Sequence, residues 1–588
     1  MDATQSPRAG SSSTLQRGKA CLNCRRRKMK CDGMRPVCGP CSRANRPDDC
    51  EYTDGQNRSR TQMLEDTIAQ LETRIHELEH PNSAPTSVML HDPHSNFYQT
   101  QQSPIAGRGE LSSPLMLSST EFSHGSHSSV SSSPPVGTAV PATLSSTSVA
   151  WIASDEPPAH VVQELFDAFF ECAPALHFFL HHVRFRHSLS LPGGNAGRPI
   201  PALINAVYLW GLVMINNNDF HHHEPILASR VASQLGSAIS TTSSHQILQV
   251  IQAKILLVNY LFRIGHFPAA LHEAHSASSL AVACGLHKVR TAQPIPAFTS
   301  YIDRIDLTLQ EPRDQIEEGE RINAFWAVFL MDRCLAVVFG PPLVISDMDA
   351  PGMQIDTPWP LEMETYERGQ IYPNLRTSGT VRSFFSGMNN GWPWENHNPL
   401  TQLSKAAALF ERAARLAATW RPEIQNIGSF YADFVAVDQR IDEFKVQLTP
   451  FDRVSSQNVP LVHLAYCLSN GATIQLHATF SSQNTGSRAK CLSAAIAMVR
   501  ANHAAHVQEY TFTNPILGSL WAACGRVIIN EIVARRCTVA EPTTSPEQRD
   551  GELRNALEQI QSVMAVPALR CRLMSYYLGR LQQESTGI

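Results

Sequence analysis

Six cysteines lie within the first fifty residues, and they constrain the local fold more than any other feature of the chain. They are Cys21, Cys24, Cys31, Cys38, Cys41 and Cys50, with the spacing C-x2-C-x6-C-x6-C-x2-C-x8-C. Cysteines separated by two residues are typical of metal sites, because both thiolates can reach one ion. A segment this short has almost no hydrophobic core, so metal binding would supply its folding free energy.

Zinc is the metal that such a ligand set favours. Each Zn²⁺ takes four thiolates in a tetrahedron, so two ions need eight ligand positions. Six cysteines meet that demand only if two of them bridge both ions. The first three cysteines and the last three repeat nearly the same spacing, and each half can place a short helix after its C-x2-C pair. We therefore expect two zinc ions. A disulfide cluster is disfavoured, because the other eight cysteines lie singly in apolar stretches, as in reduced intracellular proteins.

The first six-residue gap between cysteines is strongly basic. Its cationic side chains are Arg25, Arg26, Arg27, Lys28 and Lys30. Residues 1–46 carry eleven Lys or Arg against two Asp, which leaves −13 on the rest of a chain whose net charge is −4. A basic terminus on an acidic body is typical of a nucleic-acid-binding protein. On a short helix, some of these cations would contact phosphates while one or two reach base edges in the major groove.

The cysteine block resembles the fungal binuclear zinc cluster (Zn2Cys6) family of transcription factors. The resemblance covers Cys21 to Cys50, includes C-R-R-R-K-M-K-C at 24–31, and has Pro36 where the family has its loop proline. It implies that Cys21 and Cys38 bridge the two ions. It also implies that Lys28, with its neighbour Arg27, contacts the groove of double-stranded DNA, often at a CGG-type triplet, and that the protein is nuclear. A zinc module used for protein contacts or for RNA stays open as the alternative.

Residues 61–80 carry a heptad pattern. The apolar positions alternate by four and three: Leu64, Ile68, Leu71, Ile75 and Leu78. This spacing predicts a short coiled coil, although a single amphipathic helix packed on its own domain fits the same pattern. Members of the resembled family commonly have a coiled coil after the last cysteine, which favours dimerisation. A homodimer would then set its half-site spacing through the linker at 52–60.

The composition changes twice beyond the heptads. Residues 81–155 are rich in Ser, Pro and Thr and bury too little apolar surface to offset the entropy of ordering, so they predict a disordered linker. From 156 to 588 apolar residues recur at steps of three and four almost throughout, which predicts a large all-α domain. Breaks rich in Pro, Gly and Asn fall near 291–316, 351–399, 451–459 and 538–549.

The segment 319–349 has the clearest pattern in the helical domain. Ile322, Phe325, Trp326, Phe329 and Leu330 form one apolar face, and Gly340 followed by two prolines ends the helix. Within this face, Asp332 and Arg333 should form an ion pair or bond to nearby backbone. The segment is similar to the middle homology region of the same fungal regulators, and 269–287 resembles the helical segment that precedes it.

Catalysis is the competing interpretation of this domain. Asp347 with Asp349, or the histidine runs 181–182 and 221–223, could suggest a carboxylate pair or a metal site. Consecutive histidines point to different sides of a helix and make poor tetrahedral sites. The sequence contains no HExxH, GxSxG, Walker or dinucleotide motif. It also contains no apolar run of eighteen residues and no secretory signal at its start, so we expect no membrane partner.

Together these patterns predict a Zn2Cys6 DNA-binding domain at 17–51, a linker at 52–60, a coiled-coil helix at 61–80, a disordered linker at 81–155 and an all-α regulatory domain at 156–588. The expected function is sequence-specific regulation of RNA polymerase II transcription, with the transcription machinery or co-regulators as partners and a small-molecule inducer as a possible ligand. An enzyme with a DNA-binding appendage and a zinc-dependent interaction scaffold are the two alternatives.

Overall fold

The computed structural model describes most of the body and the cysteine block. The described residues are 20–47, 49–50, 52, 69, 157–215, 223–241, 246–293, 307–348, 352–372, 374–388, 398–421, 426–537 and 546–586. The chain divides into two compact units, Met1–Pro134 and Pro135–Ile588. The five predicted dimerisation residues, Leu64, Ile68, Leu71, Ile75 and Leu78, and the predicted linker at 81–155 lie outside the described residues, so both stay predictions.

The N-terminal unit contains two short helices, α1 (Leu22–Arg26) and α2 (Gly39–Arg43). Each helix starts at the first cysteine of a C-x2-C pair, which is the N-cap residue, and contains the second. The expected short helix is therefore present in both halves, but it begins between the two cysteines of the pair rather than after them. The apolar interior of this unit consists of cysteine side chains, with Val37 and Tyr52 packed against them.

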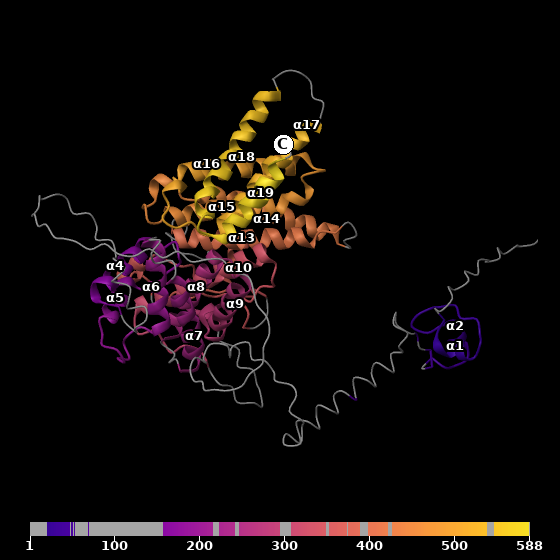
Figure 1. The fold of residues 1–588 in the computed structure, drawn as a ribbon, viewed down its shortest axis with the longest axis horizontal. Helices are drawn as coiled ribbons and strands as arrows, with labels where there is room; N and C mark the ends of the chain where they lie inside the picture. The colour runs from indigo at the N-terminus through magenta and orange to yellow at the C-terminus, as the bar shows by residue number, and fades with distance from the viewer. Residues whose placement is uncertain are drawn as a thin grey trace, which may run out of the picture. The chain divides into compact units, whose positions relative to one another are not determined.

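The body begins with a group of helices drawn in purple and magenta in Figure 1. They are α4 (Ala159–Cys172), α5 (His182–Leu189), α6 (Pro201–Ile215), α7 (Glu224–Thr241), α8 (Ile247–Ile264) and α9 (Phe267–Ala283). Helix α6 is apolar on nearly all sides because α4, α7 and α8 all pack on it. Trp210 at its centre is fully buried and donates its indole N–H to the Leu256 carbonyl at 2.9 Å.

The second group of helices is drawn in orange and yellow in Figure 1. It comprises α13 (Pro399–Thr419), α14 (Ile427–Gln447), α15 (Val459–His477), α16 (Thr485–Ala504), α17 (Ile516–Cys537), α18 (Pro546–Ala568) and α19 (Arg572–Ser585). Helix α15 packs against α13, α14, α16 and α17 and is the centre of this group. Its apolar residues join one large core that also includes residues of α8, α9 and α10 (Gln315–Phe339).

Helix α10 joins the two groups, because it packs on α8 and α9 on one side and on α13 on the other. Its predicted apolar face is confirmed: Ile322, Phe325, Trp326, Phe329 and Leu330 are all buried. The Asp314 carboxylate caps the helix start by accepting the Glu317 backbone N–H at 2.9 Å. Gly340, at φ +80°, ends the helix as predicted, in a conformation that other residues rarely adopt.

Asp332 and Arg333 are buried within α10, and the expected partners are present. The Asp332 carboxylate accepts the backbone N–H groups of Val344 and Ile345, each at 3.1 Å. The Arg333 guanidinium donates to Asp332 at 3.2 Å and to the Ile345 carbonyl at 2.9 Å. Both charges therefore hold the chain that leaves α10 against the helix.

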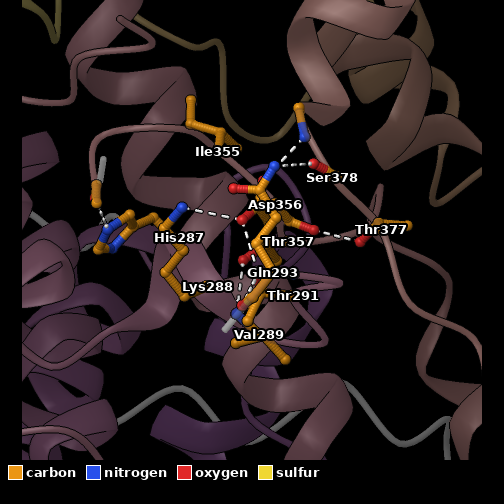
Figure 2. Close-up of polar contacts among 12 residues, drawn as sticks. His287, Lys288, Val289, Thr291, Gln293, Ile355, Asp356, Thr357, Thr377 and Ser378 are labelled. Atoms are coloured by element: carbon orange, nitrogen blue, oxygen red, sulfur yellow. Dashed lines mark hydrogen bonds and ion pairs between the residues drawn. The ribbon is translucent and has the colours of Figure 1, made fainter. Parts of the chain in front are cut away.

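A second buried carboxylate, Asp356, ties the irregular segment after α10 to the end of α9 (Figure 2). It has no exposed surface and accepts hydrogen bonds from Lys288 at 2.9 Å, Thr291 at 2.7 Å and the Gly379 N–H at 2.8 Å. Burial alone would raise the pKa of Asp356, but these donors and the Lys288 charge hold it below its usual range. The surrounding backbone is paired as well, including an isolated parallel bridge between Thr291 and Thr377.

The helical prediction for the body is confirmed, and no β-strand occurs in the parts of the chain that the structure describes. Two short helices, α11 (Met363–Glu367) and α12 (Thr380–Phe385), interrupt the break predicted at 351–399. Three helices, Ile247–Ile264, Gln315–Phe339 and Ile516–Arg536, are long and apolar enough to cross a membrane by length and composition alone. In each of these helices, 67% of the apolar stretch of 18 residues is buried inside the body.

We expect Asp356→Ala to lower the free energy of unfolding of the body by about 3–5 kcal/mol, because it leaves the Lys288 charge buried without its partner. Asp442→Ala is the matched control. The Asp442 side chain pairs with Lys490 but is 53% exposed, so its loss should cost less than about 1 kcal/mol. Thermal and denaturant unfolding of the full chain measure both effects.

The stabilisation of the body by Asp356 should decrease as the pH falls. Because the folded pKa of Asp356 is lowered, its stabilisation is complete above the unfolded pKa of about 3.9 and is lost as the pH falls through the folded value. The difference between wild type and Asp356→Ala should therefore shrink at acidic pH. A difference that is the same at pH 7 and at pH 3 would contradict the assignment.

Candidate metal centre and nucleic-acid interface

Four of the six predicted metal ligands form one compact group in the N-terminal unit. Cys21, Cys24, Cys38 and Cys41 are fully buried, and their Sγ atoms lie within 4.8 Å of one another. The Sγ atom of Cys21 lies 3.7 Å from those of Cys38 and Cys41. The Sγ atom of Cys24 lies 3.6 Å from that of Cys38 and 3.8 Å from that of Cys41.

These sulfur–sulfur separations fit a tetrahedral zinc site. Thiolates about 2.3 Å from zinc lie about 3.8 Å from one another at the corners of a tetrahedron. Four of the six sulfur–sulfur separations in the group are 3.6–3.8 Å and match that edge length, and the other two are within 4.8 Å. Disulfide-bonded sulfurs would instead lie about 2.0 Å apart. The chemistry of the group is equally specific, because an all-sulfur tetrahedral site favours Zn²⁺ over ions such as Mg²⁺ and Ca²⁺.

The remaining two cysteines are half-buried and lie beside Cys38. The Sγ atoms of Cys31 and Cys38 and a carboxylate oxygen of Asp32 are within 4.8 Å of one another. The Cys50 thiol accepts the Cys38 backbone N–H at 3.2 Å. Cys38 thus has thiol neighbours from both halves of the repeat, which is the position that a bridging ligand needs.

Three of the four thiols in the buried group hold their protons tightly when no cation is near, whereas hydrogen bonds from Cys38 and Asn23 outweigh burial and lower the pKa of Cys41. Burial raises the pKa of Cys24 to about 12 and raises the pKa values of Cys21 and Cys38 as well. The pKa of Cys31 is lowered to about 7, because hydrogen bonds from the Cys21 and Gly33 backbone and from Tyr52 outweigh the effect of burial. Zinc binding replaces thiol protons, so the affinity of such a site depends on pH.

The two halves of the block repeat each other in backbone detail, with an offset of seventeen residues. The Cys21 and Cys38 carbonyls each accept a hydrogen bond from the N–H four residues later, both at 2.9 Å. In each half, the residue after the C-cap of the helix has φ +54°, and it is Lys28 in the first half and Asn45 in the second. Asn tolerates this left-handed conformation well, whereas Lys adopts it at a cost of about 1 kcal/mol.

All five predicted DNA-binding side chains, Arg25, Arg26, Arg27, Lys28 and Lys30, are exposed. Only the first two lie in α1, which ends at Arg26, and Arg27 is its C-cap residue. The predicted short helix therefore carries only the first two cations of the run. The turn that follows the helix presents Lys28 and Lys30, and its left-handed residue directs the chain away from the helix axis.

Two residues that sequence reasoning missed organise the loop between the halves. The Asp32 carboxylate accepts the Gly39 N–H at 2.9 Å, at the first residue of α2, and the Met34 N–H at 3.2 Å. The Tyr52 hydroxyl donates to the Met34 carbonyl at 2.9 Å, and the Arg35 guanidinium lies 4.8 Å from the centre of its ring. The sequence signals for these two residues were their positions: the Asp directly follows the third cysteine, and the Tyr lies two residues after the last cysteine.

Among the predicted candidates of the body that the structure describes, none belongs to a comparable cluster of metal-ligand types. Asp347 lies 3.9 Å from Arg382, whereas Asp349, His221 and His222 lie outside the described residues. His181 is buried and contacts Glu367 at 2.6 Å, while its neighbour His182 is exposed.

A Ser–His–Asp arrangement does occur in the body, because His477 lies 3.0 Å from both Ser487 and Asp438. Ser487 and His477 are only 6% and 4% exposed. The hydroxyl is therefore closed to a substrate, and the network holds α14, α15 and α16 together.

Comparison with known proteins places the cysteine block in a defined family. Residues 19–59 match the sequence profile of the fungal Zn(2)-Cys(6) binuclear cluster domain. The C6 finger domain transcription factor hasF of Aspergillus fumigatus is 46% identical over 59 residues, which are 9% of this chain and 8% of that protein. No solved structure matches the chain.

Two relatives resemble a larger part of the chain. They are the citrinin biosynthesis transcriptional activators mrl3 of Monascus ruber and ctnR of Monascus purpureus, each 25% identical over 365 residues, or 58% of this chain. The matched region spans 65% and 58% of their lengths, less than two thirds of either. The cysteine geometry and the family match agree, and the N-terminal block of this chain is a fungal Zn(2)-Cys(6) binuclear cluster domain, whose cofactor is a pair of zinc ions.

Proposed function

We propose that this protein is a zinc-dependent transcription factor that binds DNA by sequence and regulates RNA polymerase II transcription. One observation carries the proposal: a run of exposed cations, Arg25 to Lys30, is built directly onto a buried group of zinc-ligating residue types. The names of the relatives, which describe transcriptional activators and a C6 finger transcription factor, support the same function and favour activation.

The ligands in this proposal are Cys21, Cys24, Cys31, Cys38, Cys41 and Cys50, and they hold two zinc ions. The ions supply the cross-links that a domain without a hydrophobic core requires. The chain's own residues do the rest. The thiolates orient α1 and α2, the Asp32 and Tyr52 contacts hold the loop between them, and the cationic run stays exposed on one edge.

Base recognition falls to the end of the cationic run. Arg25 and Arg26 project from a helix of five residues, where they reach phosphates on either side of a groove. Lys28 stands at the turn beyond that helix, held by the Lys28 N–H bond to the Arg25 carbonyl at 3.2 Å. A cation placed at a fixed turn suits the O6 and N7 acceptors of guanine, consistent with a CGG-type half-site.

Dimerisation and regulation complete the proposal. The heptads at 61–80 pair two chains, and residues 52–60 set the distance between half-sites. The helical body then regulates activity or recruits the transcription machinery and co-regulators in the nucleus, and it does not act as an enzyme. The names of the relatives, which describe transcription factors, support this last point.

Cys38→Ala tests the metal assignment. We expect wild type to hold two zinc ions per chain and the variant to hold fewer than about one, because a shared ligand serves both ions. Cys491→Ala, which removes a buried cysteine of the body, should keep both ions. Elemental analysis of the purified chains gives the stoichiometry, and two ions in a DNA-binding Cys38→Ala protein would refute the bridging role.

Lys28→Ala tests base recognition. We expect it to weaken binding to a CGG-containing duplex by about 1–3 kcal/mol and to relax the preference for guanine. Arg43 is a basic residue of the second helix and should contact only phosphates. Arg43→Ala should therefore weaken binding equally for all sequences, and by less than Lys28→Ala weakens binding to the CGG-containing duplex. Binding titrations on matched and scrambled duplexes at fixed salt separate the outcomes. Equal loss from Lys28→Ala on every duplex would reduce Lys28 to a phosphate contact.

Leu71→Lys tests the dimer. A charge in the apolar seam should leave the chain monomeric at micromolar concentration, whereas Gln70→Lys, one position outside the seam, should not. Sedimentation of the full chain measures the mass. A dimeric Leu71→Lys protein would show that residues 61–80 do not form the interface.

A further inference from the structure

The body contains a cavity of about 510 Å³ next to α10. Its wall comes from the chain after α4, from α10, from the segment before α11, and from the first turns of α13 and α15. Buried apolar side chains form its inner part: Phe179, Trp326, Leu330, Leu403 and Leu461. A volume of this size falls in the range of small-molecule sites. The inner apolar part is continued by a polar part, to which Ser455, Gln457 and Asn458 contribute.

One polar side chain in the inner wall has an unmet hydrogen-bonding atom. Asn323 is 6% exposed, and its Nδ2 donates to the Leu361 carbonyl at 3.2 Å. That bond requires the amide nitrogen to face the carbonyl, so the orientation of the amide is set. Its buried Oδ1 accepts no hydrogen bond from any residue that the structure describes. A donor on a ligand would satisfy this oxygen.

The entrance to the cavity disfavours anions. Its outer wall includes the carboxylates of Glu362 and Glu364, and neither Lys nor Arg is among the residues described around the cavity. Glu362 accepts a hydrogen bond from Asn458 at 2.9 Å, which fixes one carboxylate at the rim. His177, also in the wall, is neutral near pH 7 because burial lowers its pKa to about 4. The other titratable side chains described in the cavity wall are His181 and His182, and His181 is paired with Glu367.

We propose that this cavity binds an uncharged, largely aromatic small molecule that carries a hydrogen-bond donor. The aromatic part lies against Trp326, Leu330 and Leu403, and the donor reaches Asn323 Oδ1. Such a ligand would contact the α4–α5 connection, α10, α13 and α15 at once, so its binding ties the two helix groups of the body together. The site is independent of the DNA-binding proposal, since every residue in it belongs to the body.

The probe is N-phenyl-1-naphthylamine, an uncharged aromatic amine with one N–H donor whose fluorescence rises in apolar surroundings. We expect saturable binding to the full chain at one molecule per chain, with a rise in the unfolding temperature that grows with probe concentration. Its sulfonated analogue, 8-anilinonaphthalene-1-sulfonate, has the same skeleton and should bind at least about tenfold more weakly, because its charge meets Glu362 and Glu364. Equal affinity for both probes would overturn the ligand class.

Two variants locate the probe. Ala327→Phe fills the cavity and should abolish binding, whereas Ala432→Phe, on the exposed side of α14, should leave it unchanged. Asn323→Leu should weaken the amine about tenfold but change binding of 1-phenylnaphthalene, which lacks the donor, by less than about twofold. Circular dichroism confirms that each variant is folded.

Absence of saturable binding, or binding that survives Ala327→Phe, would overturn the site. If Asn323→Leu weakens the binding of 1-phenylnaphthalene as much as that of N-phenyl-1-naphthylamine, the role of Asn323 would be overturned. Duplex DNA binding, measured in the same preparations, should not change in any variant, so failure of this site is distinguishable from failure of the proposed function.

Discussion

The packing of four thiols at tetrahedral spacing is the constraint on which the N-terminal domain depends. Its two helices have five residues each, far too short to be stable alone, and their contact surface is made of cysteine side chains. Every other feature of the domain follows from that centre. Cys21 and Cys38 are the N-cap residues of the two helices, and the Asp32 carboxylate accepts a hydrogen bond at the start of the second. The cationic run begins in the first helix, and its side chains are exposed.

The body solves a different problem, which is to hold long irregular segments on a helical core. Buried carboxylates do this at two points. Asp332 receives two backbone N–H groups beyond the end of α10, and Asp356 joins the end of α9 to residues near Gly379. Each carboxylate has a basic partner, so the charge is compensated where it is buried. The same segments then supply part of the wall of the cavity next to α10.

Much of this arrangement was predictable, because it rests on local periodicity and ligand spacing. The apolar face of α10, its glycine stop and the Asp332–Arg333 contacts follow from residues within one segment. Helix α14 falls within the region predicted to be helical, but its exposed apolar residues, including Ile427, Tyr431 and Val435, blur the pattern of a half-buried helix. The Asp356 contacts and the cavity could not be predicted, because they join segments that are separate in the sequence, such as Asp356 with Lys288 and Thr291, which are 68 and 65 positions away.

The candidate metal centre divides in the same way. Spacing alone indicated the six cysteines and the cations beside them. It did not show where α1 ends, because whether Lys28 continues the helix or turns out of it depends on the bonds that Met29 and Lys28 make back to the helix.

The seventeen-residue repeat in the cysteine block is symmetric in backbone but not in charge. At the left-handed position, one copy has Lys28 and the other has Asn45, and the dense run of cations belongs to the first copy alone. A module with one charged copy has a front and a back, so under the proposed function it would bind a duplex in a single polarity. Two such modules joined as a pair would therefore distinguish inverted, everted and direct arrangements of the same half-site sequence.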